Sequence, residues 1–432
     1  MSLTSSDRIP GRVWYRTGVA GMASYLDAAA IISTGTALVL YTDPFGLSTG
    51  QIGQLSAMLT FLMALGALVG GRLADKFGRK RVFLVTMGIY IVGAASLAFA
   101  PSVAFLYAGI VLLGFAVGAD LPASLAMIAE EAPPQHRGRL ISFSHILWLV
   151  GILASMLFGM VVGGMGEMGG RILYLHVLVV AVLTLVLRAS MPESHKWQAQ
   201  HEAAASGAAR EMDMGTLKRL VTGPYLLPML SVAAFYALVN VGANTGGQFT
   251  TYMYVELAGS TVSFASAVGL VTFLIAFAAT YFLMRIVDGP NRMKWFGVMA
   301  IFYSAGYLIP VVFGVNVLPL IVMGVVGSIA GAIAGEPMFK VWAQELIPTT
   351  YRSTAQGFMI FFTRVVAALV ALWTPTLLEA SPNVLFLFVA ACIAVGGLLG
   401  VFVINRFPRV ADTEDDLDAI EGSAEPEAVE AR

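Results

Sequence analysis

Two long apolar segments, 51–70 and 82–100, enclose the stretch Gly71–Arg81, and this arrangement restricts the fold more than any other feature of the chain. About 20 apolar residues cross the hydrocarbon core of a bilayer as a helix, so each flanking segment can span a membrane. The enclosed stretch reads GRLADKFGRKR and holds several bases beside Asp75. Because bases collect in cytoplasmic loops, this pattern predicts a helical hairpin whose turn lies in the cytoplasm.

The composition extends this interpretation to the whole chain. Its 432 residues are 58% hydrophobic and 12% charged, whereas a soluble domain carries about 25% charged residues. A water-soluble core cannot hide so much apolar surface, so we expect an all-α membrane protein. The single cysteine, Cys392, excludes an intrachain disulfide and a cysteine-cluster metal site. We expect no metal and no cofactor, and the first apolar run is too long for a cleaved signal peptide.

The apolar runs predict twelve transmembrane helices in two six-helix bundles. The expected helices cover 17–40, 51–71, 82–100, 104–128, 139–163, 171–190, 225–254, 261–285, 294–314, 318–345, 354–378 and 383–405. Most bases fall on one face of this arrangement: Arg8, Arg12, Arg16, Arg137, Arg139, Lys196, Arg210, Lys218, Arg219, Arg292, Lys294, Arg352, Arg406 and Arg409. The opposite loops hold Asp43, Glu167, Glu256 and Glu379, with Arg171 as their base. The positive-inside rule then predicts a multi-pass protein of the cell membrane with both termini in the cytoplasm.

The polar stretches divide the chain into four regions. We expect an N-terminal bundle at 1–190, a cytoplasmic linker at 191–222, a C-terminal bundle at 223–410 and an acidic tail at 411–432. The linker is typical of short amphipathic helices at the inner membrane surface. The tail lacks aromatic residues and is expected to be disordered.

Two charged motifs occur once in each bundle, at nearly the same spacing along the chain. Asp75 and Arg79 recur as Asp288 and Arg292, and Glu130, Pro133 and Arg137 recur as Glu345, Pro348 and Arg352. Repetition of two separate motifs indicates a duplicated six-helix unit, with solute held near the midplane between the halves. We predict that the eight charged residues of these motifs form a cytoplasmic charge network that stabilises the outward-facing state; a solvated inner surface is the alternative.

The stretch Gly71–Arg81 resembles the signature loop between the second and third helices of the major facilitator superfamily. Three further motifs resemble its sugar porter family: Arg137–Ser142, Pro192–Trp197 and Trp342–Pro348. The chain departs from that family at Leu238, Val239 and Ile110, and it has His145 where sugar porters carry a sugar-binding Gln. The run Gly118–Ser124 instead looks like the fourth helix of phosphate and organic-acid proton symporters.

The resemblance implies a monomeric carrier that takes up a small polyhydroxylated solute, a sugar or a polyol such as inositol, with a proton by alternating access. The expected partners are solute, proton and lipid bilayer, without nucleic acid. An enzyme is not expected, because the chain has no nucleotide phosphate loop, His-Glu-x-x-His motif or serine elbow. The alternatives are an organic-acid symporter, a drug:proton antiporter and a proton-independent uniporter.

Two carboxylates inside the predicted membrane helices are candidates for proton coupling. A charge at the bilayer centre costs about 2.5–3.5 kcal/mol on insertion scales, so an ionisable residue there is a functional candidate. Asp27 lies in the middle of the first helix and Asp120 lies in the fourth. Burial disfavours the charged form of a carboxylate, as a proton carrier requires. Each could instead accept a structural hydrogen bond between helices.

Seven residues are candidates for solute binding: His145, Asn240, Asn244, Gln248, Glu336, Trp342 and Arg364. Asn240, Asn244 and Gln248 are spaced by four and therefore share one face of the seventh helix. Neutral amides both donate and accept, which suits a polyhydroxylated neutral ligand. Glu336 could instead neutralise Lys340. The guanidinium of Arg364 supports the organic-anion alternative, because its fork suits a carboxylate, although it could also pair with Glu336 or Asp120.

Overall fold

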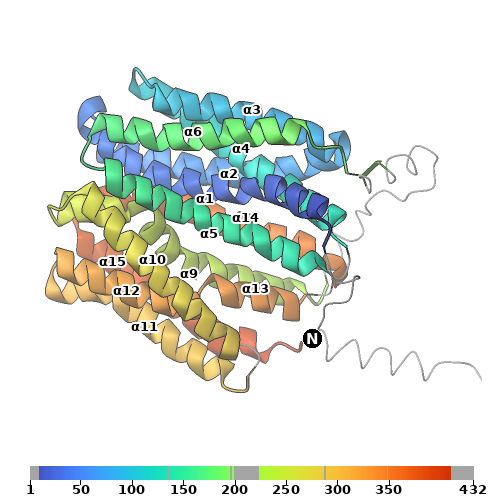
Figure 1. The fold of residues 1–432 in the computed structure, drawn as a ribbon. Helices are drawn as coiled ribbons and strands as arrows, with labels where there is room; N and C mark the ends of the chain where they lie inside the picture. The colour runs from blue at the N-terminus through green and yellow to red at the C-terminus, as the bar shows by residue number, and fades with distance from the viewer. Residues whose placement is uncertain are drawn as a thin grey trace, which may run out of the picture.

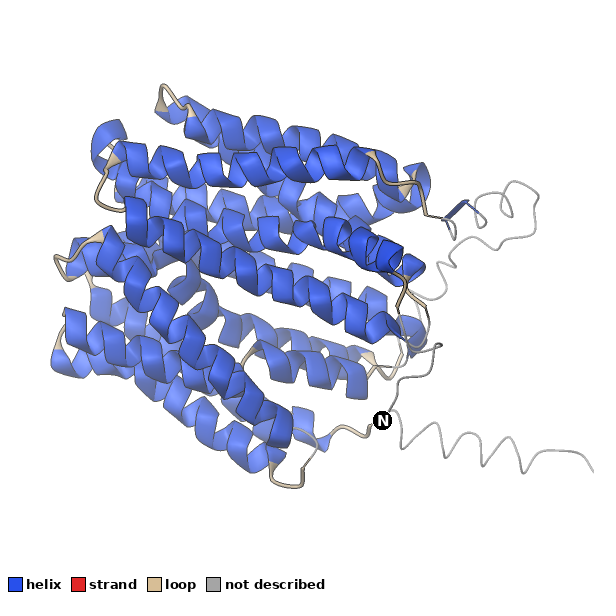
Figure 2. Cartoon of the chain, viewed as in Figure 1, coloured by secondary structure: helices blue, strands red, loops and turns tan. Residues whose placement is uncertain are grey.

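The computed structural model describes residues 9–133, 136–194, 197–198, 223–286, 289–347 and 349–409. Over these residues the chain is a set of helices joined by short loops and turns (Figure 2). Most of the predicted linker and the whole predicted tail lie outside the described residues, as do Asp288 and Pro348.

Twelve helices of the described chain are long and apolar enough to cross a membrane, which confirms the predicted fold class. The helices are α1 Gly11–Phe45, α2 Thr49–Phe77, α3 Arg79–Ala98, α4 Val103–Glu131, α5 Arg137–Val162, α6 Glu167–Ala189, α9 Leu226–Tyr252, α10 Val262–Ile286, α11 Arg292–Phe313, α12 Val317–Ala334, α13 Glu336–Glu345, α14 Thr349–Ala380 and α15 Pro382–Phe402, with short turns η3 Met253–Leu257 and η4 Ile404–Arg406. The helices α12 and α13 together make the tenth span.

The helices form two groups that follow the order of the chain (Figure 1). Helices α1 to α6 lie together in the upper part of the view, and α9 to α13 and α15 lie below them. The two groups, which we call the first half and the second half, meet where α14 packs against α2, α10 against α5 and α9 against α1. We call the face where α1 begins and α2 ends the basic end, and the other face the opposite end.

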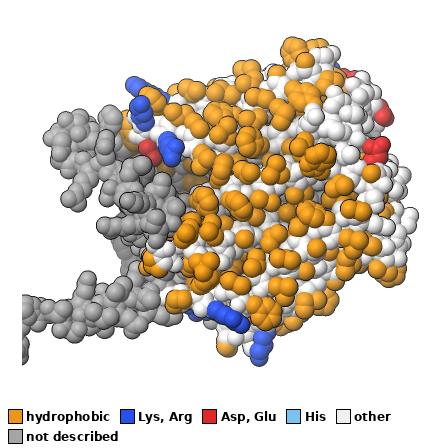
Figure 3. All heavy atoms as spheres, turned by 180° about the vertical axis from the view of Figure 1, so that it is seen from behind, with side chains coloured by type: hydrophobic (Ala, Val, Ile, Leu, Met, Phe, Trp, Pro, Cys, Tyr) orange, Lys and Arg blue, Asp and Glu red, His pale blue; other side chains and the backbone are white. Residues whose placement is uncertain are grey.

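The outer surface matches a bilayer. Apolar side chains cover the middle of the molecule, while Lys and Arg atoms lie toward the basic end and acidic atoms are visible at the opposite end (Figure 3). Large apolar residues such as Val161, Ile301 and Leu369 are exposed on this surface. Exposed apolar area on such a scale requires lipid rather than water around it, so the chain is a multi-pass membrane protein.

Two spans of the second half depart from a regular α-helix. The tenth span breaks at Gly335, whose φ of −104° and ψ of −136° are not helical, and α13 restarts at Glu336 with Pro337 in its first turn. Proline is tolerated there because its missing N–H has no partner inside the helix. The seventh span ends in the π-helical turn η3. Both irregularities occur in spans that contribute to the cavity described below.

Glycines allow the halves to approach closely toward the opposite end. A Cβ atom added at Gly35 of α1 would overlap the backbone of Gln248 in α9. One added at Gly53 of α2 would overlap the carbonyl of Leu372 in α14. The absence of a side chain at these two positions therefore permits the packing of the halves at this level.

Candidate solute site

A cavity of about 500 Å³ lies between the two halves. Small-molecule sites typically measure about 300–1,000 Å³, so the cavity has the size of a solute site. Helices α1 and α5 form its wall in the first half, and α9 to α13 form the wall in the second half. A solute in this cavity touches both halves and can stabilise one arrangement of them over another.

The polar face of α9 supplies much of the second wall. Asn240, Asn244 and Gln248 all line the cavity. The Gln248 amide donates to Oδ1 of Asn244 over 2.9 Å and to the Thr60 hydroxyl of α2 over 2.8 Å. Within the described chain, the Nδ2 atom of Asn244 is buried and has no hydrogen-bond partner. An unpartnered buried amide costs free energy, so this N–H group is a ready donor to a solute oxygen.

The Asp27 carboxylate lies beside this cavity and is 3% exposed. Its Oδ2 accepts a 3.0 Å hydrogen bond from Trp148 Nε1, and Oδ1 lies 3.6 Å from the Arg364 guanidinium. Asp27 and Trp148 belong to the first half, whereas Arg364 comes from α14 of the second. The ion pair therefore crosses between the halves. The sequence offered Glu336 or Asp120 as partners of Arg364 and did not indicate Asp27, because the packing of α14 against the first half leaves no local pattern in the chain.

Asp120 has a different environment, entirely within the first half. Its Oδ1 lies 2.6 Å from the Arg188 guanidinium of α6, and both side chains are almost completely buried. Arg188 also donates to the Ala20 carbonyl and to the Ser124 hydroxyl. Asp120 is thus held in a bonded network away from the cavity lining, and its partner is Arg188 rather than Arg364. Arg188 was missed in the sequence, although a base near the end of an apolar run is a visible signal.

The remaining predicted ligands differ in whether they line the cavity. Glu336 lines the cavity and forms a 2.8 Å ion pair with Lys340, one turn along α13. His145 stacks on Trp148 with ring centroids 5.6 Å apart, and it is outside the cavity lining. The structure does not support Trp342 as a ligand. Its ring is 2% exposed and packs edge-on against Phe235 at 4.8 Å, inside the core of the second half.

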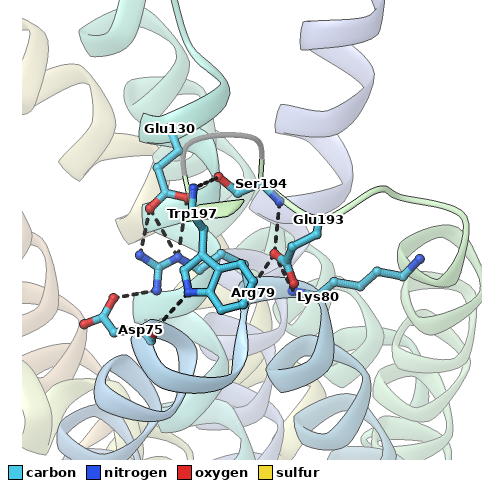
Figure 4. Close-up of polar contacts among 7 residues, drawn as sticks. All are labelled: Asp75, Arg79, Lys80, Glu130, Glu193, Ser194 and Trp197. Atoms are coloured by element: carbon cyan, nitrogen blue, oxygen red, sulfur yellow. Dashed lines mark hydrogen bonds and ion pairs between the residues drawn. The ribbon is translucent and has the colours of Figure 1, made fainter. Parts of the chain in front are cut away.

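The charged motifs at the basic end form ion pairs inside each half. In the first half, Arg79 binds Asp75 at 2.5 Å and Glu130 at 2.7 Å (Figure 4). Glu193 accepts hydrogen bonds from the backbone N–H groups of Arg79 and Lys80, at the N-terminus of α3. A carboxylate at a helix N-terminus satisfies free N–H groups and the helix dipole, so the segment after α6 is fixed to the start of α3.

The second half repeats one of these ion pairs. Arg292 of α11 binds both carboxylate oxygens of Glu345, at 2.6 and 3.0 Å. The side chains of Arg137 and Arg352, like Asp288, lie outside the described residues. Every ion pair seen among the described members of the predicted network joins residues of one half, rather than the two halves. The statement that the network stabilises the outward-facing state remains a prediction.

Comparison with known proteins identifies the family. The model of the Major Facilitator Superfamily matches residues 17–372, which is most of the chain. The chain belongs to the major facilitator superfamily. It is therefore a transport protein and not an enzyme, as the sequence predicted.

Individual relatives resemble the chain over different shares of its length. The minor myo-inositol transporter IolF of Bacillus subtilis is 31% identical and covers 84% of each chain. The niacin transporter NiaP of Acinetobacter baylyi is 33% identical over a shorter match, 41% of this chain and 39% of that protein. The inward-open structure of the xylose transporter XylE from E. coli has a TM-score of 0.74 at 17% identity, covering 94% of this chain and 99% of XylE.

These similarities agree with the sequence motifs of the major facilitator superfamily. The signature loop of the superfamily is the α2–α3 turn, where Gly78 has a φ of +97° that favours glycine. The likeness to inositol and xylose transporters agrees with the sugar-porter motifs of the sequence. In this superfamily the solute site lies between the halves, and the cavity walled by α1, α5 and α9 has that position.

Proposed function

We propose that the protein carries a small neutral polyhydroxylated solute, a polyol such as inositol or a sugar, into the cell together with a proton. It works as a monomer in the cell membrane, with both termini in the cytoplasm. The two halves rock about the central cavity, so that the solute is exposed to one side at a time. No bond is made or broken; the solute acts through its different affinity for the two arrangements.

The observation that carries this proposal is the neutral polar wall of the cavity. Amides of Asn240, Asn244 and Gln248 line it beside hydroxyl groups of Thr36 and Thr251. Amides and hydroxyls donate and accept, as the hydroxyl groups of a polyol do. The likeness to the inositol transporter IolF supports the same solute class.

The position of Arg364 favours a neutral solute over an organic anion. Its guanidinium lies next to Asp27 and is not part of the cavity lining. An anionic solute would have to compete with the Asp27 carboxylate for this cation. Lys340 is paired with Glu336, which lines the cavity.

Asp27 is the proposed proton carrier. It is buried, and its ion pair with Arg364 joins the two halves. Protonation removes the carboxylate charge and with it the attraction to Arg364. Less free energy is then needed to separate the two halves around Asp27. Asp120 is bound to Arg188 within one half, and we assign it a structural role.

An uptake assay in proteoliposomes tests the function. The labelled probes are myo-inositol, D-xylose, D-glucose and nicotinate, each offered with an inward proton gradient and again with a protonophore. We expect myo-inositol or one of the two sugars to accumulate and the protonophore to abolish accumulation. Accumulation of nicotinate alone, or accumulation that the protonophore leaves unchanged, would contradict the proposal.

A further inference from the structure

Two side chains reach the carboxylate of Asp27, and they differ in their access to the solute. Trp148 donates its indole N–H to Oδ2, and Arg364 lies by Oδ1. Trp148 lines the cavity, while Asp27 and Arg364 do not. Of the three residues in this cluster, Trp148 is therefore the one that a solute in the cavity touches directly.

The two partners also differ in the half to which they belong. Trp148 on α5 and Asp27 on α1 are both in the first half, whose helices α1 and α5 pack along each other. Arg364 is on α14 of the second half. When the halves rock, the Trp148–Asp27 hydrogen bond can persist, whereas the Arg364–Asp27 ion pair changes with the arrangement of the halves.

We propose that Trp148 is a coupling residue: solute that contacts its indole displaces the N–H from Asp27 and so favours protonation of that carboxylate. This inference depends on the proposed function, in which Asp27 carries the proton. A hydrogen bond to a charged carboxylate is stronger than one to the neutral acid, so a displaced indole N–H favours the neutral form. Because coupling between two ligands is reciprocal, a proton on Asp27 then favours solute binding.

Other groups around Asp27 do not provide the same connection. The titratable groups that face it from neighbouring helices are Arg364 of α14, Glu336 of α13, Tyr236 of α9 and Tyr90 of α3. Glu336 and Tyr236 line the cavity, and no hydrogen bond from either to the Asp27 carboxylate is seen in the described structure. Trp148 combines contact with the cavity and a hydrogen bond to the proton carrier.

The test compares Trp148→Phe with the purified wild-type protein in proteoliposomes, using labelled myo-inositol. Phe keeps an aromatic face in the cavity and removes the N–H. Two rates are measured: accumulation driven by a proton gradient, and counterflow exchange without one. Trp373→Phe on α14 is the matched control, because that ring is 62% exposed on the outer surface. Elution from a sizing column shows whether each variant is folded.

We expect Trp148→Phe to lower accumulation by about tenfold more than it lowers counterflow, the effect of one hydrogen bond to a charged group. Trp148→His, whose ring also carries an N–H, is expected to regain part of the accumulation. Equal loss of accumulation and counterflow would overturn the inference, because it would make Trp148 only a solute contact or a structural residue. Unchanged accumulation would overturn it as well.

The same assay separates this inference from the function on which it depends. If Asp27→Asn retains accumulation, the proposed function itself is wrong. If Asp27→Asn abolishes accumulation and Trp148→Phe does not, only the role of Trp148 fails. In the double variant, counterflow should fall below that of Asp27→Asn by no more than Trp148→Phe alone lowers it, because the indole N–H acts through Asp27. A further tenfold fall in the double variant would indicate an independent effect on solute and would overturn the inference.

Discussion

At the scale of single residues, the proposed solute site includes an amide nitrogen that has no hydrogen-bond partner within the described chain. Asn244 Nδ2 is buried and unbonded within the described chain, while its Oδ1 accepts from Gln248. Folding has therefore left one donor unsatisfied at the cavity wall. A buried donor without a partner is costly, and a solute oxygen can remove that cost.

Replacing Asn244 should weaken solute binding. We expect Asn244→Ala to raise the KM for myo-inositol uptake by about tenfold, which corresponds to one hydrogen bond of about 1.4 kcal/mol. Asn316→Ala is the control, since Asn316 is exposed next to the start of α12, away from the cavity. An equal KM in wild type and Asn244→Ala would place the solute elsewhere.

The buried pair of Asp120 and Arg188 makes a different prediction, about stability. Removal of one partner leaves an uncompensated buried charge, which costs about 3–5 kcal/mol. We expect Arg188→Met to lower the melting temperature in detergent markedly. Arg171→Met breaks the more exposed Arg171–Glu167 pair and the hydrogen bonds of Arg171 to the Ala98 and Ala100 carbonyls, and it should lower the melting temperature less, because exposed pairs contribute about 0–1 kcal/mol. Similar melting temperatures for the two variants would refute a structural role for Arg188.

Single residues also show what could and could not be predicted from the sequence. The sequence could indicate Asp27, Asn244 and Gln248, because a polar group inside an apolar span costs free energy and is therefore a functional candidate. Their partners could not be selected, since Trp148 and Arg364 come close to Asp27 only through the packing of α1, α5 and α14. The sequence also did not show that Trp342 packs on Phe235, because helical position alone does not tell which side of α13 faces the cavity.

At the scale of elements, hydropathy predicted all twelve spans because bilayer thickness sets their length. Hydropathy located the ends of the helices less accurately, because α1 and α14 extend beyond their apolar runs. Hydropathy also did not show the break at Gly335, which lies within an apolar segment. The nearby Pro337 was a signal for a bend, and the structure places the interruption two residues before it.

The close contact of α2 with α14 yields a prediction about conformation. A methyl group at Gly53 overlaps the Leu372 carbonyl, so Gly53→Ala should open the opposite end. We expect a longer distance between spin labels at positions 102 and 316, measured in a Cys392→Ser background. Gly88→Ala is the control, because a Cβ there meets no other atom within 4 Å. An unchanged distance distribution would show that this contact does not hold the end closed.

At the scale of the whole molecule, two groups of helices enclose a cavity whose walls come from both. The duplicated charged motifs of the sequence predict two similar units, because a repeated signature implies a repeated element. The arrangement of those units was not contained in the motifs. Ion pairs such as Arg79–Glu130 and Arg292–Glu345 lie within each half, whereas Asp27–Arg364 crosses between them.

The central claim is that solute and proton move together through Asp27. It is tested most directly by adding unlabelled myo-inositol to proteoliposomes that contain a pH-sensitive dye, with no imposed proton gradient. The account predicts that the lumen acidifies as the inositol enters, and that Asp27→Asn shows inositol exchange without acidification. Inositol entry into wild-type vesicles with no change in luminal pH would contradict it.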